Sequence, residues 1–300
     1  MVRLIASLAL AAVGAAWFYF LALPWPVTLR SRNPERTAMM AYRLERAAAR
    51  GETLEIRHQW VPLDQISRHL RRAVIVAEDS RFYEHAGVDW AALREEVRYT
   101  GDEEFSWTDR EDLKALLEAV RYYRENRDKI RGRSTITQQV AKNLYFGPER
   151  SIVRKFEEFL VARRLERFLS KDRILEIYLN VAEWGPGIFG AEAAAQTYFG
   201  RSAASLTLEQ AAALAATLPH PLTSNPSHRP GRMRWRQELI LTRMGATPAQ
   251  PQPAPLAIEP PEPELLSVPI PDPTPIVPVV DPVRPDTTPP DTAATGVQPG

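Results

Sequence analysis

Cysteine is absent from the 300 residues of this chain. Without it the chain forms no disulfide, carries no thiolate nucleophile and offers no cysteine-based zinc site. This suits a reducing cytoplasm and an oxidising periplasm equally. The chain also lacks an excess of charge of one sign, because 38 Lys and Arg residues against 37 Asp and Glu residues leave a net charge of +1. Arginines are nevertheless dense in the middle of the sequence, so a basic groove is compatible with this balance.

Proline is sparse over most of the chain and dense at its end. Seventeen of the 27 prolines lie from Pro248 onward, and Arg284 is the one cation of that segment. Proline supplies no backbone hydrogen-bond donor, so a segment this rich in it builds no packed core. We therefore predict a disordered, extended tail over residues 246–300, with two roles left open, a spacer and a docking segment.

Long apolar runs are missing as well, with one exception. Residues 4–23 carry no charge, and 20 helical residues at about 1.5 Å each span a hydrocarbon layer of about 30 Å. We predict a membrane anchor over 1–25, followed by a linker and juxtamembrane helix over 26–57. A secretory signal peptide is the alternative, which the length of the run and its aromatic end disfavour. Arginines flank both ends, so the positive-inside rule does not settle the orientation.

Between these ends the signals are helical, without an internal repeat or a series of alternating strands. Ser170 is placed to cap a helix that runs to residue 180, and Thr207 with Gln210 forms a capping box before an alanine-rich helix. Residues 151–169 predict a third helix. The sequence therefore predicts a mainly α domain.

One segment, residues 95–130, departs from this pattern. It is heavily charged, and its apolar residues Leu113, Leu116, Leu117 and Val120 form only a narrow helical stripe. We predict an exposed loop and one surface helix here.

The first of three polar stretches surrounds Glu78. This residue directly follows a short apolar run, and a carboxylate at the edge of an apolar environment has a raised pKa, which suits general acid–base work. An exposed glutamate at a helix end is the alternative. Asp79 and His85 are expected to hold the following loop in shape rather than to share the chemistry of Glu78.

The second stretch, residues 132–146, is dense in neutral donors and acceptors. Such a run suits a hydroxyl-rich ligand, while a capped helix with an amide-rich solvated face is the alternative. The candidate binding residues of this stretch are Ser134, Thr135, Gln138, Gln139, Lys142 and Asn143.

The third stretch combines cations with a carboxylate. Arg154, Lys155 and Glu158 share one helix face, and Arg150 precedes them. A helical salt-bridge ladder and an anion site explain this spacing equally well. Adding Lys142 favours a phosphate-sized anion, because several convergent cations exceed what one glutamate pairs.

Together and in this order, these stretches resemble the peptidoglycan glycosyltransferases, lysozyme-like enzymes that polymerise lipid II. The resemblance covers residues 58–245, which we take as the glycosyltransferase domain. No "KTG" occurs and no serine is followed by lysine at the third position, so the closest resemblance is to the monofunctional biosynthetic transglycosylases. The resemblance is carried by "EDSRFYEHAGVD" (78–89), "GRSTITQQVAKN" (132–143), "RKFEE" (154–158), "KDRILEIYLN" (171–180) and "GPGIFGAEAAAQTYFG" (185–200).

This resemblance implies a reaction and a role for each candidate. Glu78 would be the general base that takes a proton from the 4-hydroxyl of N-acetylglucosamine in lipid II. The freed oxygen would attack C1 of N-acetylmuramic acid with inversion, and undecaprenyl diphosphate would leave. Glu158 matches the family's second carboxylate, which positions groups or assists the leaving group. Lys142, Arg150, Arg154 and Lys155 would stabilise the diphosphate, and Ser134, Thr135 and Gln138 would line the sugar site.

The resemblance also implies a location and partners. The chain would be a single-pass protein of the cytoplasmic (inner) membrane with its catalytic domain in the periplasm, acting on lipid II and the growing glycan strand. The family gives the tail no function, so contacts of the tail with cell-wall synthesis proteins stay open, and no nucleic acid is expected. A divalent cation, Mg²⁺ or Mn²⁺, at the diphosphate stays open because the sequence shows no independent ligand set for one.

Two features depart from the family pattern, the tail and the segment between Asp89 and Gly132. The latter is longer than expected by roughly twenty residues, in a region that borders the acceptor site in the family. Two rival functions remain. A lytic enzyme of the same broad fold would need no cations for a diphosphate, and an inactive anchored scaffold would use the tail to recruit partners.

Overall fold

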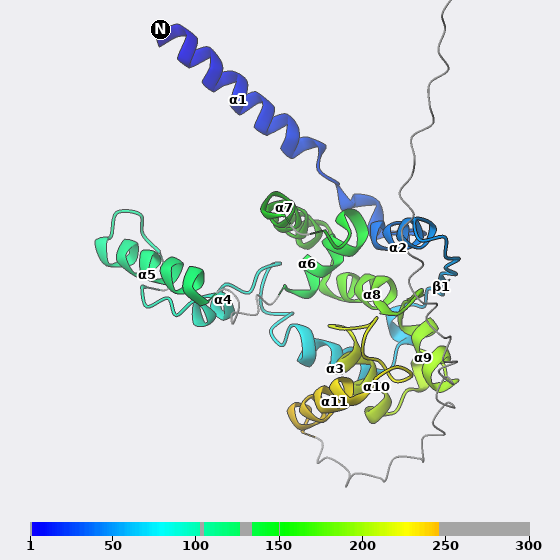
Figure 1. Ribbon diagram of the computed structural model, residues 1–300. Coiled ribbons are helices and arrows are strands. Elements are labelled where there is room, and N and C mark those ends of the chain that lie inside the picture. The colour runs from blue at the N-terminus through cyan, green and yellow to red at the C-terminus, as the bar shows by residue number, and fades with distance from the viewer. Residues whose placement is uncertain (1, 103–104, 127–133, 150, 246–300) are drawn as a thin grey trace, which may run out of the picture. The chain divides into compact units, whose positions relative to one another are not determined.

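The computed structural model describes residues 2–102, 105–126, 134–149 and 151–245. Arg150, the tail and parts of the insert at 95–130 therefore lie outside the described residues. Within them the fold is mainly helical, as predicted (Figure 1). The elements up to the insert are α1 (Val2–Ala22), η1 (Pro26–Arg30), α2 (Ala38–Ala48), β1 (Arg57–His58), η2 (Leu63–Gln65), α3 (Arg68–Glu78), α4 (Trp90–Glu96) and α5 (Arg110–Asn126). The elements after it are α6 (Ile136–Ala141), the π-helical turn η3 (Lys142–Phe146), α7 (Ile152–Phe168), α8 (Lys171–Val181), β2 (Glu183–Gly185), β3 (Ile188–Phe189), α9 (Ala191–Phe199), η4 (Ala203–Ser205), α10 (Leu208–Thr217) and α11 (Gly231–Arg243).

The core forms around α8 and α10. The Ser170 side chain accepts a bond from the backbone N–H of Arg173 and so starts α8, whose residues from Ile177 to Val181 are all buried. Helix α10 begins with the predicted capping box of Thr207 and Gln210. Its alanines let α3 and α11 pack closely against it, and α6 packs against α7 and α8 (Figure 1). This packing brings the C-terminal end of α3 near α6 and α11.

A small three-stranded sheet has the strand order β1-β3-β2. Strand β1 precedes α8 in the sequence, whereas β2 and β3 follow it. Strand β1 pairs with β3 in parallel, and β2 pairs with β3 in antiparallel register. Gly187 makes the turn between β2 and β3 with a φ of +71°, and its carbonyl accepts the backbone N–H of Arg57 at 2.8 Å. A Cβ at this glycine would lie 2.4 Å from the carbonyl oxygen of Glu55, so the turn requires glycine.

Helix α1 is exposed along most of its length and is, in the part of the chain that the structure describes, the one helix long and apolar enough to cross a membrane. A signal sequence near the N-terminus meets the same test of length and composition. The end of α1 is fixed to α7 by Arg164. The guanidinium of this buried residue donates to the carbonyls of Phe20 at 2.5 Å, Leu23 at 2.5 Å and Pro24 at 3.1 Å.

Helix α7 forms as predicted, but its burial differs from a simple apolar face. Glu158 and Arg164 are among its buried residues, whereas Ile152 and Phe156 are exposed. The insert contains the predicted surface helix, α5. Of its predicted apolar stripe, Leu117 and Val120 are exposed and Leu113 and Leu116 are half-buried, because the buried residues of α5 are small or polar, among them Asp112.

Candidate active site

Glu78 is the last residue of α3, and its side chain is 12% exposed. Its Oε2 accepts a hydrogen bond from Gln139 Nε2 at 3.0 Å, and its Oε1 accepts one from Arg236 Nη2 at 2.9 Å. Burial raises the pKa of this carboxyl, and the bonds from Gln139 and Arg236 with the charge of Lys142 offset only part of that effect. Glu78 is therefore a carboxylate held in place with a raised affinity for a proton, as a general base requires.

Arg236 comes from α11, 158 residues after Glu78, and no sequence motif pointed to it. It also donates to the backbone carbonyl of Ala77 at 3.1 Å, which fixes the guanidinium at the end of α3. A signal was present in the sequence. Arg236 lies between Met233 and Ile240 at helical spacing, and both of these residues are buried, so an arginine stands on the apolar face of an amphipathic helix.

Gln139 is oriented by three contacts. Besides its bond to Glu78, its Nε2 donates to the carbonyl of Ser134 at 3.2 Å, and its Oε1 accepts the hydroxyl of the fully buried Tyr178 at 3.0 Å. Because the amide oxygen is occupied by a donor, the amide nitrogen faces the carboxylate. Gln139 thus positions Glu78.

Other candidate residues of the second polar stretch (132–146) also form hydrogen bonds within the protein. Thr135 and Gln138 form a capping box at the start of α6, and the Thr135 hydroxyl donates to the carbonyl of Gly87 at 2.7 Å. The capped-helix interpretation of this stretch therefore holds for these two residues. Both still line the cleft beside Glu78, together with Ser134. Asn143 is 6% exposed in η3 and so has little surface for a ligand.

Glu158 is held inside a salt-bridge ladder on α7. Its Oε1 pairs with Arg154 and its Oε2 with Lys155 at 3.1 Å, and its side chain is only 3% exposed. Lys155 also donates to Ser134 Oγ at 2.8 Å, which joins α7 to the start of α6. The ladder and a cationic surface coexist, because Lys155 is 48% exposed and lines the same cleft as Glu78.

Lys142 of η3 is close enough to Arg154 of α7 and Glu78 of α3 for their charges to shift its pKa. Burial lowers the pKa of its ammonium group, the neighbouring Arg154 lowers it further, and the charges of Glu78 and Glu183 act in the opposite direction. Partial burial and the charges of Arg154 and Lys142 lower the pKa of Lys155 to about 8. Burial is the larger cause of both shifts and the crowding of like charges the smaller one, and an anion that bound between the cations would relieve the repulsion.

A second carboxylate near Lys142 was not among the predicted residues. Glu183 of β2 forms a bidentate ion pair with Arg43 of α2, with Nε–Oε1 and Nη2–Oε2 distances of 2.8 and 2.7 Å. Burial raises the pKa of Glu183, and Arg43 offsets part of this effect. This ion pair joins α2 to strand β2 of the small sheet.

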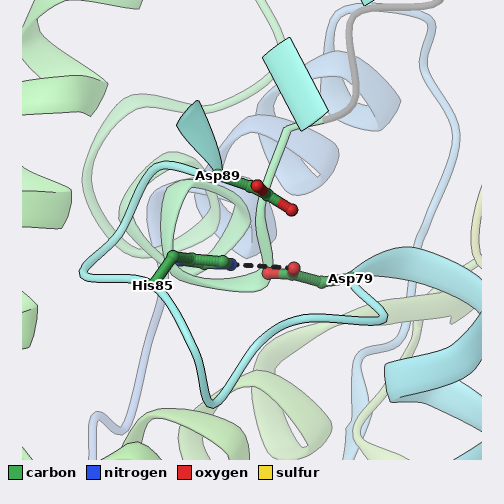
Figure 2. A group of neighbouring side chains, drawn as sticks. All are labelled: Asp79, His85 and Asp89. Atoms are coloured by element: carbon green, nitrogen blue, oxygen red, sulfur yellow. Dashed lines mark hydrogen bonds and ion pairs between the residues drawn. The ribbon is translucent and has the colours of Figure 1, made fainter. Parts of the chain in front are cut away.

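Asp79, His85 and Asp89 form a compact group in the loop after Glu78 (Figure 2). Their ligand-type atoms lie within 4.8 Å of one another, as a small cation would require. Interactions within the protein already engage them. Asp79 accepts His85 Nε2 at 2.9 Å and the backbone N–H of Ile136 at 3.0 Å, while Asp89 accepts a bidentate bond from Arg81. The group joins the loop to the start of α6 and so stabilises the conformation of the loop.

A cleft of about 790 Å³ joins these features. Its walls include Glu78 from α3, Ser134, Thr135 and Gln138 at the start of α6, and Lys155 from α7. Glu158 is not among the residues that line it. Of the described candidates, a carboxylate base, polar groups and one partly exposed cation therefore share one space.

Comparison with known proteins bears on this arrangement. The family model described as transglycosylase matches residues 45–104 and 92–245, and the two pieces overlap where the insert begins. These pieces cover more than half of the chain. The chain therefore belongs to the transglycosylase family.

Curated relatives cover most of the chain and carry the name biosynthetic peptidoglycan transglycosylase. One from Herminiimonas arsenicoxydans is 41% identical over 229 residues, which is 76% of this chain and 88% of the relative. One from Bordetella pertussis is 42% identical over 213 residues (71% and 80%), and one from Thiobacillus denitrificans is 39% identical over 247 residues (82% and 94%). The protein is thus an enzyme of the glycosyl-transfer class.

Proposed function

We propose that this enzyme is a monofunctional peptidoglycan glycosyltransferase that polymerises lipid II into glycan strands. The observation that carries the proposal is the cleft itself. A buried carboxylate with a raised pKa and a cation-bearing helix wall face the same space. This is the set of groups that a sugar hydroxyl and a diphosphate leaving group require.

In the proposed reaction Glu78 takes the proton of the 4-hydroxyl of an N-acetylglucosamine unit. The oxygen then forms a bond to C1 of N-acetylmuramic acid at the reducing end of the strand, and the bond from C1 to undecaprenyl diphosphate breaks. A single displacement of this kind inverts the configuration from α to β. Arg236 and Gln139 hold the carboxylate in line for the proton.

The leaving diphosphate carries its own negative charge and needs cations rather than a proton donor. Lys142, Arg154 and Lys155 supply the positive charge that stabilises it, and Arg150 is a further candidate outside the described residues. We assign Glu158 as a positioning residue, because its two oxygens hold Arg154 and Lys155 at the start of α7. The depressed pKa of Lys155 fits this role, since a bound anion restores its charge.

Among the described residues, the group with the spacing of a cation site is Asp79, His85 and Asp89, but Asp79 already bonds to His85 and Ile136, and Asp89 to Arg81. The oxygens of Glu158 pair with Arg154 and Lys155, and those of Glu78 bond to Gln139 and Arg236. No step of the proposed reaction therefore passes through a metal ion.

We further propose that α1 anchors the enzyme in the cytoplasmic membrane with the cleft in the periplasm. The bonds from Arg164 to the carbonyls at the end of α1 support this, because they join the anchor directly to the helix that carries Glu158. The polyprenyl chain of the substrate can then stay in the bilayer while its headgroup enters the cleft. Contacts of the tail with cell-wall synthesis proteins remain a prediction.

The test uses purified full-length protein and labelled lipid II, with glycan chains separated by gel. Wild type is expected to form polymer. Glu78→Gln keeps the shape of the side chain but removes the base, so we expect its rate to fall by a factor of about 10² to 10⁴. Circular dichroism and an unchanged melting temperature serve as the folding control. Release of fragments from preformed peptidoglycan would instead identify a lytic enzyme, and turnover of neither substrate would identify a scaffold.

A further inference from the structure

Hydrogen bonds among its own residues stabilise the part of the insert that the structure describes. Asp112, which is 2% exposed, accepts bonds from the Tyr99 hydroxyl at 2.8 Å and from the backbone N–H groups of Asp102 at 2.9 Å and Ser106 at 2.8 Å. These bonds fix the connection between α4 and α5. The carboxylate accepts three donors, and the hydrogen bonds from Ser106 and Tyr99 lower its pKa, so it stays ionised at neutral pH.

Cation–π contacts then join the ends of the two helices. The Arg98 guanidinium, just after α4, lies 4.7 Å from the ring centre of Tyr122 on α5. The start of α4 is fixed to the body, because the rings of Trp90 and Phe159 of α7 lie 6.3 Å apart in an edge-on contact. Helices α4 and α5 are thus held as one unit, which is attached to α7.

This unit forms one wall of the cleft that contains Glu78. Leu93, Glu95 and Glu96 of α4 line it, and so does Tyr123 of α5. The neighbouring tyrosines of α5 therefore differ in use. Tyr122 packs under Arg98 and holds the insert together, whereas Tyr123, 49% exposed, lines the space in front of Glu78.

The composition of this wall matches a saccharide. An aromatic ring packs against the C–H face of a pyranose, and nearby carboxylates accept hydrogen bonds from its hydroxyl groups. Lys155, the cation of the cleft that we assign to the diphosphate, belongs to α7 and not to the insert. The insert wall is therefore suited to the sugar part of the substrate and not to its phosphates.

We propose that Tyr123 is a specificity-determining residue, a platform on which the insert binds a sugar ring of the acceptor or of the glycan strand. This rests on the proposed function, because the same cleft must hold the reacting sugars. Glu95 and Glu96 are the hydrogen-bond acceptors that accompany the platform. Tyr123 contributes to binding and takes no part in the bond-making step.

The experiment compares wild type with Tyr123→Ala, Tyr123→Phe and Leu117→Ala in two assays. The first is the rate of polymer formation against lipid II concentration. The second is binding of soluble, uncrosslinked glycan strands, followed by tryptophan fluorescence without turnover. Leu117 is 68% exposed on the outward stripe of the same helix, so Leu117→Ala controls for general effects on α5.

For Tyr123→Ala we expect the KM for lipid II and the Kd for glycan strands to rise about 3- to 10-fold, with kcat within about twofold. Tyr123→Phe keeps the ring and should match wild type within about twofold, as should Leu117→Ala. Unchanged KM and Kd in Tyr123→Ala, alongside normal polymer formation, would overturn the assignment of Tyr123 and leave the proposed function intact. Equal losses in Tyr123→Ala and Leu117→Ala would show a structural effect of α5 and would also overturn it. Absence of polymer from wild type would contradict the proposed function itself.

Discussion

Glu78 is subject to two opposing influences, burial at the end of α3 and a positive charge from α11. Burial disfavours its ionised form, whereas the ion pair with Arg236 at 2.9 Å and the bond from Gln139 favour it. A base that is held only by hydrogen bonds would be protonated over more of the neutral range. If Glu78 is the base, this balance should set the lower pH limit of the enzyme, and the neighbouring Arg236 allows it to be tested.

Removing the charge of Arg236 should move the acid limb of the rate profile. Arg236 lowers the pKa of Glu78, so Arg236→Met should raise that pKa, and kcat/KM should begin to fall at a higher pH than in wild type. Arg236→Lys keeps the charge and should show a smaller shift. The measurement is the polymerisation rate from pH 4.5 to pH 8. An acid limb at the same pH in wild type and Arg236→Met would contradict the coupling.

Lys155 should determine an alkaline limb. Without a bound anion its pKa is about 8, so the ammonium group is charged below that pH and loses its charge above it, and kcat/KM should fall above about pH 8. Lys155→Arg carries a group that stays charged, so its alkaline limb should move to higher pH. Lys155→Met should lower kcat about 10²-fold at pH 7. An alkaline limb that is unchanged in Lys155→Arg would rule out this residue as its source.

At the scale of the elements, local caps and turns decide where helices and strands begin. Ser170, Thr207 and the capping box of Thr135 each satisfy backbone N–H groups three residues away, so sequence alone indicates them. The turn between β2 and β3 differs, because Gly187 is required by the distant carbonyl of Glu55 as well as by its own backbone angle.

A pair of glycines separates these two requirements. Gly51 and Gly187 have nearly the same φ, +70° and +71°, but a Cβ at Gly51 meets no atom within 4 Å. Gly51→Ala should lower the free energy of unfolding by about 1 kcal/mol, the cost of the left-handed conformation. Gly187→Ala should lower it by about 3 kcal/mol or more, because the backbone must also move. Denaturant unfolding measures both, and equal losses would show that the contact with Glu55 is relieved without cost.

At the scale of the whole molecule, the connection between α1 and α7 rests on one buried arginine. Arg164 donates to three carbonyls at the end of α1, and its guanidinium lies 3.9 Å from the ring centre of Trp25 and 4.4 Å from that of Phe20. Leu23 and Pro24 follow the last residue of α1, and the Phe20 carbonyl also accepts the backbone N–H of Leu23 at 3.3 Å, so the arginine caps the end of α1 from outside.

Arg164→Met should therefore loosen the end of α1 from α7. Loss of these charged hydrogen bonds should lower the free energy of unfolding by about 2–4 kcal/mol, measured as thermal unfolding in detergent micelles. Arg163→Met is the matched control. This neighbouring arginine is exposed and donates to a single carbonyl, that of Ala86, so its loss should cost less than about 1 kcal/mol. Similar melting temperatures for the two variants would show that Arg164 does not cap α1.

The sequence by itself determined the helical class, the apolar segment at 4–23, the starts of α7, α8 and α10, and Glu78 as the candidate base. These depend on residues within a few positions of one another, or on motifs in a fixed order. Tertiary structure decided which groups meet. It brought Arg236 to Glu78 across 158 residues, joined Lys155 of α7 to Ser134 at the start of α6, and placed Tyr123 of α5 in the wall of the cleft. Such pairings follow from how α3, α10 and α11 pack, and packing depends on the shape of whole helices, which no local pattern encodes.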